Sequence, residues 1–304
     1  MLLFIGTGPF VRYDKPIDDE TLLTQVAKAI REKRPTIVVI NGPIIDVNHP
    51  QLISYAKRTY FDLYVHLRNQ LIKAARDIDA RIIFIASFRE FGPCPVYPTP
   101  PNIDYLSKGI PEELIRDGKV QFAPDPCFLQ LNVDHESNGP MLLISSTDVI
   151  MHMSGEETAL GSDPLARDRI SRICRKIITT GSVYPMNPSN LDVPMNYSLW
   201  SKNCSFKPLR TSNHHPNRRL PHCFIMPSFI NFPTKVQPLW SVVAETAEQC
   251  DVITFRLISL HTYWIEKAEI ALLREALQFS VDSLIWVMLK QWAQPISFFP
   301  AQFL

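Results

Sequence analysis

The stretch TIVVINGPIIDVNHP, residues 36–50, decides the fold. It begins with TIVVI (36–40), a β-branched run typical of a parallel strand that is buried on both faces of its sheet. The strand then runs into Asn-Gly-Pro, and ligands of open α/β sheets bind beyond the carboxyl ends of the strands. Residues 41–50 are therefore the first place to look for a functional site.

The sequence around this strand alternates between strand and helix patterns. Apolar runs predict strands over 2–6 and 81–86, and apolar residues at helical spacing predict helices over 18–34 and 54–77. After a proline-rich loop the pattern changes to shorter strands, predicted over 119–124, 127–133, 141–146 and 223–227, with a helix over 164–178. We predict an α/β fold of mixed β-sheets flanked by helices.

The C-terminal part of the chain has a different composition. Residues 269–292 show helical periodicity and are unusually apolar, but charged residues interrupt the segment, so a membrane span is not expected. We therefore predict a mostly helical tail over 237–304, after a first domain over 1–236 that contains a loop-rich insertion at 185–221.

Composition excludes few classes of protein. The 304 residues carry a net charge of +1, which creates no strong field toward nucleic acid or an anionic membrane. Six scattered cysteines without a CxxC pair favour free thiols in a reducing compartment. The opening MLLFIG lacks the basic flank and the length of a signal peptide, so we interpret it as a strand.

Several polar residues follow the predicted strands and could be metal ligands. The candidates are Asp46, His49, Glu90, Asp148 and His152. A two-metal hydrolytic site needs several such ligands around ions about 3.5–4 Å apart. The alternative interpretation is capping aspartates and ordinary histidines, and we prefer it because the first and last strand ends offer no ligand.

Other motifs with a chemical meaning are weak or missing. A second cluster of possible zinc ligands (Cys204, His214, His215, His222 and Cys223) matches no known zinc spacing. Arg210, Arg218 and Arg219 form only a small basic patch in the same stretch, which we interpret as a surface loop. The sequence has no GxSxG, P-loop or GxGxxG motif. From the residues alone we predict no catalytic residue, metal or cofactor.

Seven segments, taken in chain order, resemble the accessory B subunits of DNA polymerase alpha–primase. They are TGPF (7–10), INGPIIDVNHP (40–50), SFREFGPCPVYPTPP (87–101), VQFAPDPC (120–127), SSTDVIMHMSGEE (145–157), DRISRICRKIITTGSVYPMNP (168–188) and PHCFIMPSFINF (221–232). The GPxxDxxH turn and the PVYPTPP loop are the most specific of these. The resemblance implies a calcineurin-like phosphoesterase sandwich.

The resemblance also implies that the phosphoesterase site has been lost. Active members carry DxH, GDxxD, GNH and GHxH motifs at successive strand ends, and proline stands here where the metal-bridging aspartate belongs. The degenerate-site positions are Gly8, Pro9, Gly42, Pro43, Asp46, His49, Ser87, Arg89, Asp148, His152 and Ser228. By this resemblance, Asp46 has the residue type of the family's motif but not its role in a metal site.

The function implied by the resemblance is that of a non-catalytic scaffold. Such subunits hold the C-terminal region of the polymerase alpha catalytic subunit, and through it primase, during primer synthesis in the nucleus. We expect indirect or weak DNA contact, no membrane association, and no counterpart of the family's OB-fold and N-terminal helical domain. Phe88, Arg89 and Tyr97 are candidate contact residues.

Two alternative functions remain open at this point. One is a residually active metallophosphoesterase that uses Asp46, His49, Asp148 and His152. The other is an accessory subunit of another B-family replicative polymerase, because such subunits share the inactive domain. Metal content and phosphatase activity separate the first alternative from the scaffold.

Overall fold

The chain is described by a computed structural model that divides it into two compact units. The described residues are 2–55, 57–92, 94–130, 141–158, 169–206, 221, 223–228, 254–259, 286–288 and 297–298. The first unit comprises Met1–Pro95, Thr99–Asp125 and Thr262–Ala293, and the second comprises Val96–Pro98, Pro126–His261 and Gln294–Leu304. Within the described residues, each unit holds one five-stranded sheet. The predicted boundary at 236/237 stays a prediction.

The sheet of the first unit has the strand order β4-β3-β2-β1-β9. Its strands are β1 (Leu2–Thr7), β2 (Ile37–Asn41), β3 (Arg81–Ile85), β4 (Val120–Ala123) and β9 (Trp286–Met288). The first four are parallel, and Thr7 pairs with Asn41, which pairs with Ile85. The carboxyl ends of β1, β2 and β3 therefore lie level with one another, and the buried parallel strand predicted over 36–40 is confirmed.

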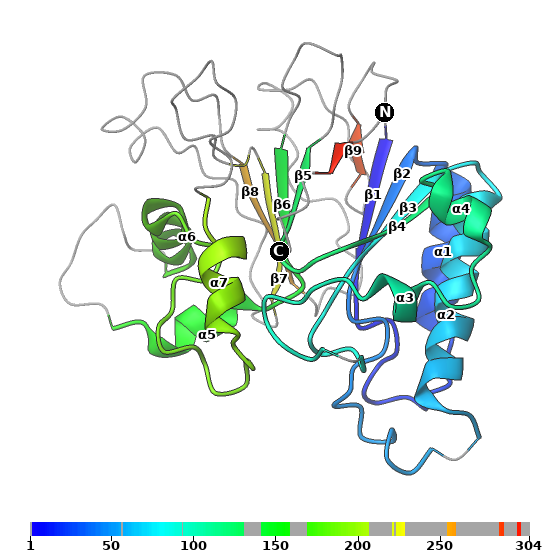
Figure 1. Cartoon of the computed structure of the whole chain (residues 1–304), viewed down its shortest axis with the longest axis horizontal. Coiled ribbons are helices and arrows are strands. Elements are labelled where there is room, and N and C mark those ends of the chain that lie inside the picture. The colour runs from blue at the N-terminus through cyan, green and yellow to red at the C-terminus, as the bar shows by residue number, and fades with distance from the viewer. Residues whose placement is uncertain are drawn as a thin grey trace. The chain divides into compact units, whose positions relative to one another are not determined.

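Two long helices cover this sheet on one side (Figure 1). They are α1 (Thr21–Lys33) and α2 (Tyr60–Arg76), and the short helices α3 (Ile103–Leu106) and α4 (Glu112–Arg116) precede β4. The helix predicted from residue 54 begins only at Tyr60. The reason is local, because the Thr59 hydroxyl accepts the Asp62 N–H at 3.1 Å and so caps the first turn.

The core of the first unit lies between these helices and the sheet. Apolar residues at i, i+4 and i+7 of α1 are buried, and so is every residue of β2. The buried residues of α1 are Leu23, Ala27 and Ile30. The segment that follows β2 continues this core, since Ile44 and Ile45 are each no more than 1% exposed. The turn after β2 is thus anchored by its own apolar side chains.

The second unit contains a mixed sheet of order β10-β5-β6-β7-β8. Its strands are β5 (Cys127–Gln130), β6 (Met141–Ile144), β7 (Cys223–Ser228), β8 (Thr254–Ser259) and β10 (Ser297–Phe298). The β5–β6 pair is antiparallel, and the residues between the two strands lie outside the described ones. The helices are α5 (Val149–Glu156), α6 (Arg169–Thr180) and α7 (Tyr197–Asn203). The predicted α/β class, with mixed sheets and flanking helices, is confirmed.

Part of the proline-rich loop belongs to the second unit. Tyr97 forms a β-bridge with Met195, and its backbone N–H donates to the Pro194 carbonyl at 3.0 Å. The Tyr97 side chain is fully buried, at 0% exposure. The prediction that Tyr97 is an exposed contact residue is therefore wrong: the aromatic ring packs inside its unit instead, 5.5 Å from the Tyr184 ring.

The predicted helical tail over 237–304 is not observed where the structure describes it, because all of its described residues lie in the strands β8, β9 and β10. The predicted helix over 269–292 is wrong at its C-terminal end. Trp286–Met288 forms β9, which pairs antiparallel with β1 through Leu3 and Val287. Tryptophan and valine favour strands, and the edge of β1 offers unpaired backbone groups to them. The remainder of that range lies outside the described residues. Among the helices that the structure describes, none combines the length and apolar character needed to cross a bilayer.

Candidate functional site

Backbone pairing continues past the carboxyl ends of β1, β2 and β3. The Gly8 N–H donates to the Asn41 carbonyl at 2.9 Å, and the Gly42 N–H donates to the Ile85 carbonyl at 3.2 Å. Phe10 N–H then donates to the Ile44 carbonyl at 3.0 Å. The Gly8–Pro9 and Gly42–Pro43 peptide bonds are both cis. Main chain therefore occupies the edge at which a parallel sheet usually presents its ligand-binding side chains.

The two glycines permit this close approach. A Cβ atom at position 8 would lie 1.8 Å from the Pro43 carbonyl oxygen, and one at position 42 would lie 2.9 Å from the Ile85 carbonyl oxygen. Real Cβ atoms essentially never come closer than 3.0 Å to a neighbouring atom. A side chain at position 8, metal-binding or otherwise, has no room here.

Asp46 is a buried member of an ion pair. Its side chain is fully buried, and its Oδ2 accepts hydrogen bonds from the Arg89 guanidinium and, at 2.5 Å, from the Tyr13 hydroxyl. Arg89 Nη2 also donates to the Tyr13 oxygen at 2.6 Å, and Asp46 Oδ1 accepts the Asn48 N–H at 2.8 Å. Burial and the Asp46 hydrogen bond raise the pKa of Tyr13 to about 12. We call Tyr13, Asp46 and Arg89 the strand-end triad.

His49 uses both of its ring nitrogens within the protein. Nε2 lies 3.0 Å from the Arg12 carbonyl oxygen, and Nδ1 lies 3.3 Å from the Gln51 backbone nitrogen. A carbonyl can only accept, so Nε2 carries the hydrogen and Nδ1 accepts from Gln51. The ring is 2% exposed and stacks on Tyr13 with centroids 6.1 Å apart. His49 thus fixes the loops that surround the triad.

The residues at these strand ends do not fit a pair of metal ions. Neither position 8 nor position 43 carries a donor side chain, and the oxygens of Asp46 and the nitrogens of His49 are already engaged. Two-metal hydrolysis needs carboxylates and imidazoles free to bridge or bind the ions. Within the part of the chain that the structure describes, no group of three or more His, Cys, Asp or Glu side chains could hold a metal.

Glu90 is the second carboxylate near the carboxyl ends of these strands, where it contacts the turn after β2. Its Oε1 accepts the Ile44 N–H at 2.7 Å. Burial raises the pKa of Glu90 to about 7, although the N–H groups of Ile44 and Ile45 and the charge of Arg68 pull it down. The pKa of Tyr64 is raised well above its ordinary value, first by burial and then by Glu90. An ionised Glu90 therefore costs stability at neutral pH.

A Glu90→Gln chain is expected to have a flatter pH dependence of stability. The unfolded carboxyl titrates near pH ~4.3, so between about pH 4.3 and 7 the native state holds a proton that the unfolded state has lost. The free energy of unfolding therefore falls as pH rises through this window, by at most about 3 kcal/mol. Urea denaturation at pH 5 and pH 8 measures the difference, which should be smaller in the Glu90→Gln chain by the contribution of Glu90.

The exposed Glu113 supplies a matched control for this test. Glu113→Gln removes the same charge from the surface of α4, so its stability curve should run parallel to that of the original chain. If the Glu90→Gln curve also runs parallel, Glu90 titrates as an ordinary carboxyl group, and the proposed effect of its burial is wrong.

Three of the degenerate-site positions lie in the second unit. Ser228 ends β7 and is 0% exposed, and Asp148 caps α5 by accepting the Met151 N–H at 2.9 Å. His152 lies on α5, where its Nδ1 is 3.3 Å from the Tyr184 hydroxyl. The other eight positions lie in the first unit, where Asp46, Arg89 and the Gly-Pro turns come together.

The possible zinc cluster lies mostly outside the described residues. Cys204 is buried, and its Sγ lies 3.7 Å from the Tyr97 hydroxyl. Cys223 begins β7. His214, His215 and His222 lie outside the described residues, together with Arg210, Arg218 and Arg219. The interpretation of this stretch as a surface loop stays a prediction.

Sequence reasoning missed Tyr13 as the partner of Asp46 and Arg89. Tyr13 is separated from Asp46 by 33 positions, and its sequence neighbourhood carries no motif. The signal that could have found it is its place, shortly after β1 and on the same edge as the other candidates. A survey of every polar residue just beyond a strand end would have included it.

The fold and the site define an α/β protein of the phosphoesterase-like type, whose strand-end carboxylate is held in a buried ion pair. A family model that describes the DNA polymerase alpha/epsilon B subunit matches residues 4–234. The chain belongs to this family. The resemblance to the B subunit of the alpha enzyme is confirmed by similar proteins that carry that name.

Three relatives illustrate the extent of the similarity. The DNA polymerase alpha B subunit of Rattus norvegicus is 29% identical over 197 residues, and that of Mus musculus is 30% identical over 199 residues. Each match covers 64% of this chain and 30% of the relative. The Drosophila melanogaster protein of the same name is 24% identical over 229 residues, which are 74% of this chain and 31% of the relative. The matched region is thus about a third of each relative's length.

Proposed function

We propose that this chain acts as the phosphoesterase-like part of a non-catalytic accessory subunit of DNA polymerase alpha–primase. Residues 1–236, with 185–221 as a loop-rich insertion, would form most of the degenerate domain, and β8, β9 and β10 from 237–304 would extend its sheets. Its role is to hold the C-terminal region of the catalytic subunit, and through it primase, during primer synthesis in the nucleus. The family match and the names of the relatives support this role.

The strand-end triad is the observation that carries the non-catalytic part of the proposal. Position 43, where the bridging aspartate belongs, is proline, and a metal-binding carboxylate must offer its oxygens to the metal, whereas Asp46 Oδ2 accepts from both Tyr13 and Arg89. Releasing Asp46 would separate a buried ion pair, a change that typically costs about 3–5 kcal/mol. The carboxylate therefore serves the structure of the turn.

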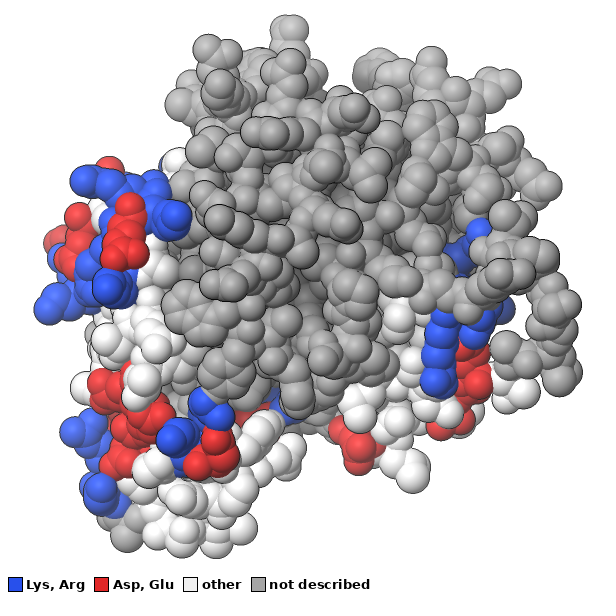
Figure 2. Space-filling model, turned by 180° about the vertical axis from the view of Figure 1, so that it is seen from behind, with Lys and Arg blue, Asp and Glu red and all other residues white. Residues whose placement is uncertain are grey.

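Contact with DNA is expected to be indirect or weak. Figure 2 shows Lys and Arg side chains next to Asp and Glu side chains on the described part of the visible face. The net charge of the whole sequence is only +1. Affinity for the phosphate backbone comes from clustered cations. A surface on which positive and negative side chains alternate therefore favours a scaffold that works through protein contacts.

The proposal is tested by pull-down of the purified chain with the C-terminal region of the polymerase alpha catalytic subunit from the same organism. We expect stoichiometric binding, no retained Mn, Fe or Zn by elemental analysis, and no hydrolysis of p-nitrophenyl phosphate. The matching region of the polymerase epsilon catalytic subunit is the control, and it should bind more weakly.

Each alternative function predicts a different result in this experiment. Preference for the epsilon region would assign the chain to another replicative polymerase. Two metals per chain, with hydrolysis lost in an Asp46→Asn variant, would establish a phosphoesterase and overturn the scaffold. A folded chain that binds neither region would contradict the tethering role.

A further inference from the structure

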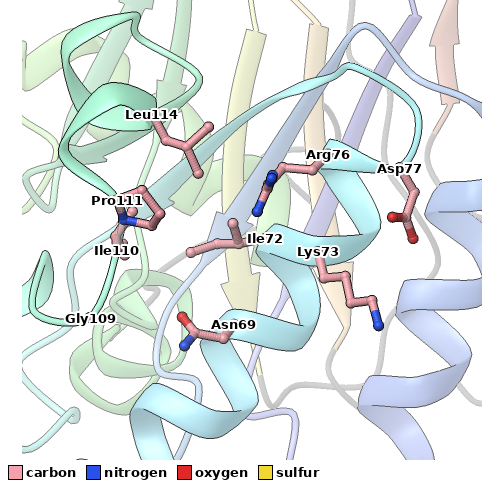
Figure 3. A pocket seen from close by; sticks show the side chains of 9 residues that line it. All are labelled: Asn69, Ile72, Lys73, Arg76, Asp77, Gly109, Ile110, Pro111 and Leu114. Atoms are coloured by element: carbon pink, nitrogen blue, oxygen red, sulfur yellow. The ribbon is translucent and has the colours of Figure 1, made fainter.

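A surface groove runs along α2 in the first unit (Figure 3). One wall is a stripe at helical spacing i, i+3, i+4, i+7 and i+8, formed by Asn69, Ile72, Lys73, Arg76 and Asp77. The other wall is the segment from Gly109 to Leu114. The groove has a volume of about 480 Å³, within the range of about 300–1,000 Å³ common for ligand sites.

The floor of the groove is apolar. Ile72 and Ile110 contribute to it from opposite walls and are 5% and 8% exposed. Leu114 is half-buried, and Figure 3 shows its side chain on the wall opposite Ile72. Filling this floor with an apolar side chain would remove the remaining exposed apolar surface from water.

A buried arginine holds the second wall in place. Arg68 is 0% exposed, and its guanidinium donates to the carbonyl oxygens of Leu106 and, at 2.9 Å, Lys108. The next residue, Gly109, has a φ of +76°, a backbone conformation that side chains other than glycine rarely adopt. The groove is therefore preformed, which lowers the entropic cost of binding.

Two cations that line the groove are not engaged within the described part of the chain. Among the described residues, neither the Lys73 ammonium nor the Arg76 guanidinium forms an ion pair or a side-chain hydrogen bond, and both residues are exposed. Asp77 does not neutralise them, because its Oδ2 lies 2.8 Å from Arg31 Nε of α1. Lys73 and Arg76 do complement the dipole of α2 at its C-terminal end, but that role does not explain the apolar floor beside them.

The surroundings favour a peptide over nucleic acid. None of the residues that line the groove is aromatic, so the groove lacks the stacking surface on which single-stranded bases are bound. Glu112 and Glu113, at the start of α4, follow the second wall directly and would repel a polyanion. A ligand with one or two carboxylates next to an apolar side chain matches two cations and an apolar floor.

We propose that this groove binds a short acidic peptide segment of a partner protein. An apolar side chain of the peptide lies over Ile72, Ile110 and Leu114, and flanking carboxylates pair with Lys73 and Arg76. This is acidic-motif recognition by a basic surface, with an apolar anchor that fixes the register. The site is separate from the strand-end triad and does not depend on the proposed tethering role.

The test is selection from a phage-displayed library of random dodecapeptides on the purified chain. Peptides that also bind a Lys73→Glu/Arg76→Glu chain are removed first. We expect enriched peptides with Leu or Phe beside Asp or Glu. The most enriched peptide, labelled with fluorescein, should bind the double variant at least about tenfold more weakly in fluorescence anisotropy.

A Lys28→Glu/Lys176→Glu chain is the matched control, since both lysines are exposed and lie outside the groove. It should bind the peptide as tightly as the original chain, and equal melting temperatures establish that all variants are folded. Equal loss in the control, or enrichment of basic peptides or of none, would overturn the proposal. So would a concentration-dependent dimer lost in the Lys73→Glu/Arg76→Glu chain, because the groove would then hold a second copy of this chain.

Discussion

A Gly8→Ala chain is expected to lose at least about 3 kcal/mol of its free energy of unfolding. The added Cβ would lie 1.8 Å from the Pro43 carbonyl oxygen. The obstacle is a backbone atom, so it cannot be relieved by a change of rotamer. The turns after β1 and β2 have to move apart, and the hydrogen bond from Gly8 N–H to the Asn41 carbonyl is lost with them.

Two other glycines give a graded series for this prediction. Gly42→Ala should cost less, because its Cβ would meet the Ile85 carbonyl oxygen at 2.9 Å. Gly155→Ala on α5 meets no atom within 4 Å and should be neutral or stabilising by up to about 1 kcal/mol, since alanine favours the helix.

Urea denaturation followed by circular dichroism measures the three stabilities. Hydrogen exchange at the amides of β1 and β2 then shows whether the loss lies in the first unit. Equal stabilities for Gly8→Ala and Gly155→Ala would contradict the close approach of the two turns.

An Arg89→Ala chain is expected to lose about 3–5 kcal/mol of stability. The change leaves the Asp46 carboxylate buried at 1% exposure without its cation. The Tyr13 hydroxyl remains as a donor to Asp46, but a neutral hydrogen bond does not compensate a buried charge. The effect should therefore resemble the removal of one partner from a buried ion pair.

A double-mutant cycle separates this charge effect from lost packing. In an Asp46→Asn background the carboxylate is absent, so Arg89→Ala should cost no more than about 1 kcal/mol. Lys57→Ala, which breaks the exposed pair with Asp18, should leave the denaturation midpoint unchanged. If Arg89→Ala costs the same in both backgrounds, the guanidinium acts through packing and not through charge.

The parallel strands could be predicted because their sequence signal is local. TIVVI and RIIFIA are continuous apolar runs, and both became strands within a residue or two of the predicted bounds. The start of α2 was predicted six residues too early, at residue 54, although Thr59 and Asp62 have the spacing of an N-terminal cap and hydrogen-bond to each other. The tail differs, since Trp286–Met288 pairs with a strand at the other end of the sequence.

The site was predictable in place but not in its contacts. Its position follows from the strand ends, and the resemblance supplied the Gly-Pro turns. The ion pair, however, joins residues 43 positions apart, and no motif near either residue identifies the other as its partner. Arg89 was assigned to the degenerate site only by its position, and Tyr97 was misplaced because burial of a loop residue depends on tertiary packing.

The strand-end triad also has an evolutionary consequence. Aspartate at position 43 alone would not create a metal site, because Asp46 would still be held by Arg89 and Tyr13. Substitution of Arg89 first would leave the Asp46 carboxylate buried without its cation, which is itself destabilising. Neither substitution is therefore favourable on its own. A carboxylate held in this way is not released for metal binding by successive point mutations, so the identity of Asp46 in an alignment says nothing about activity.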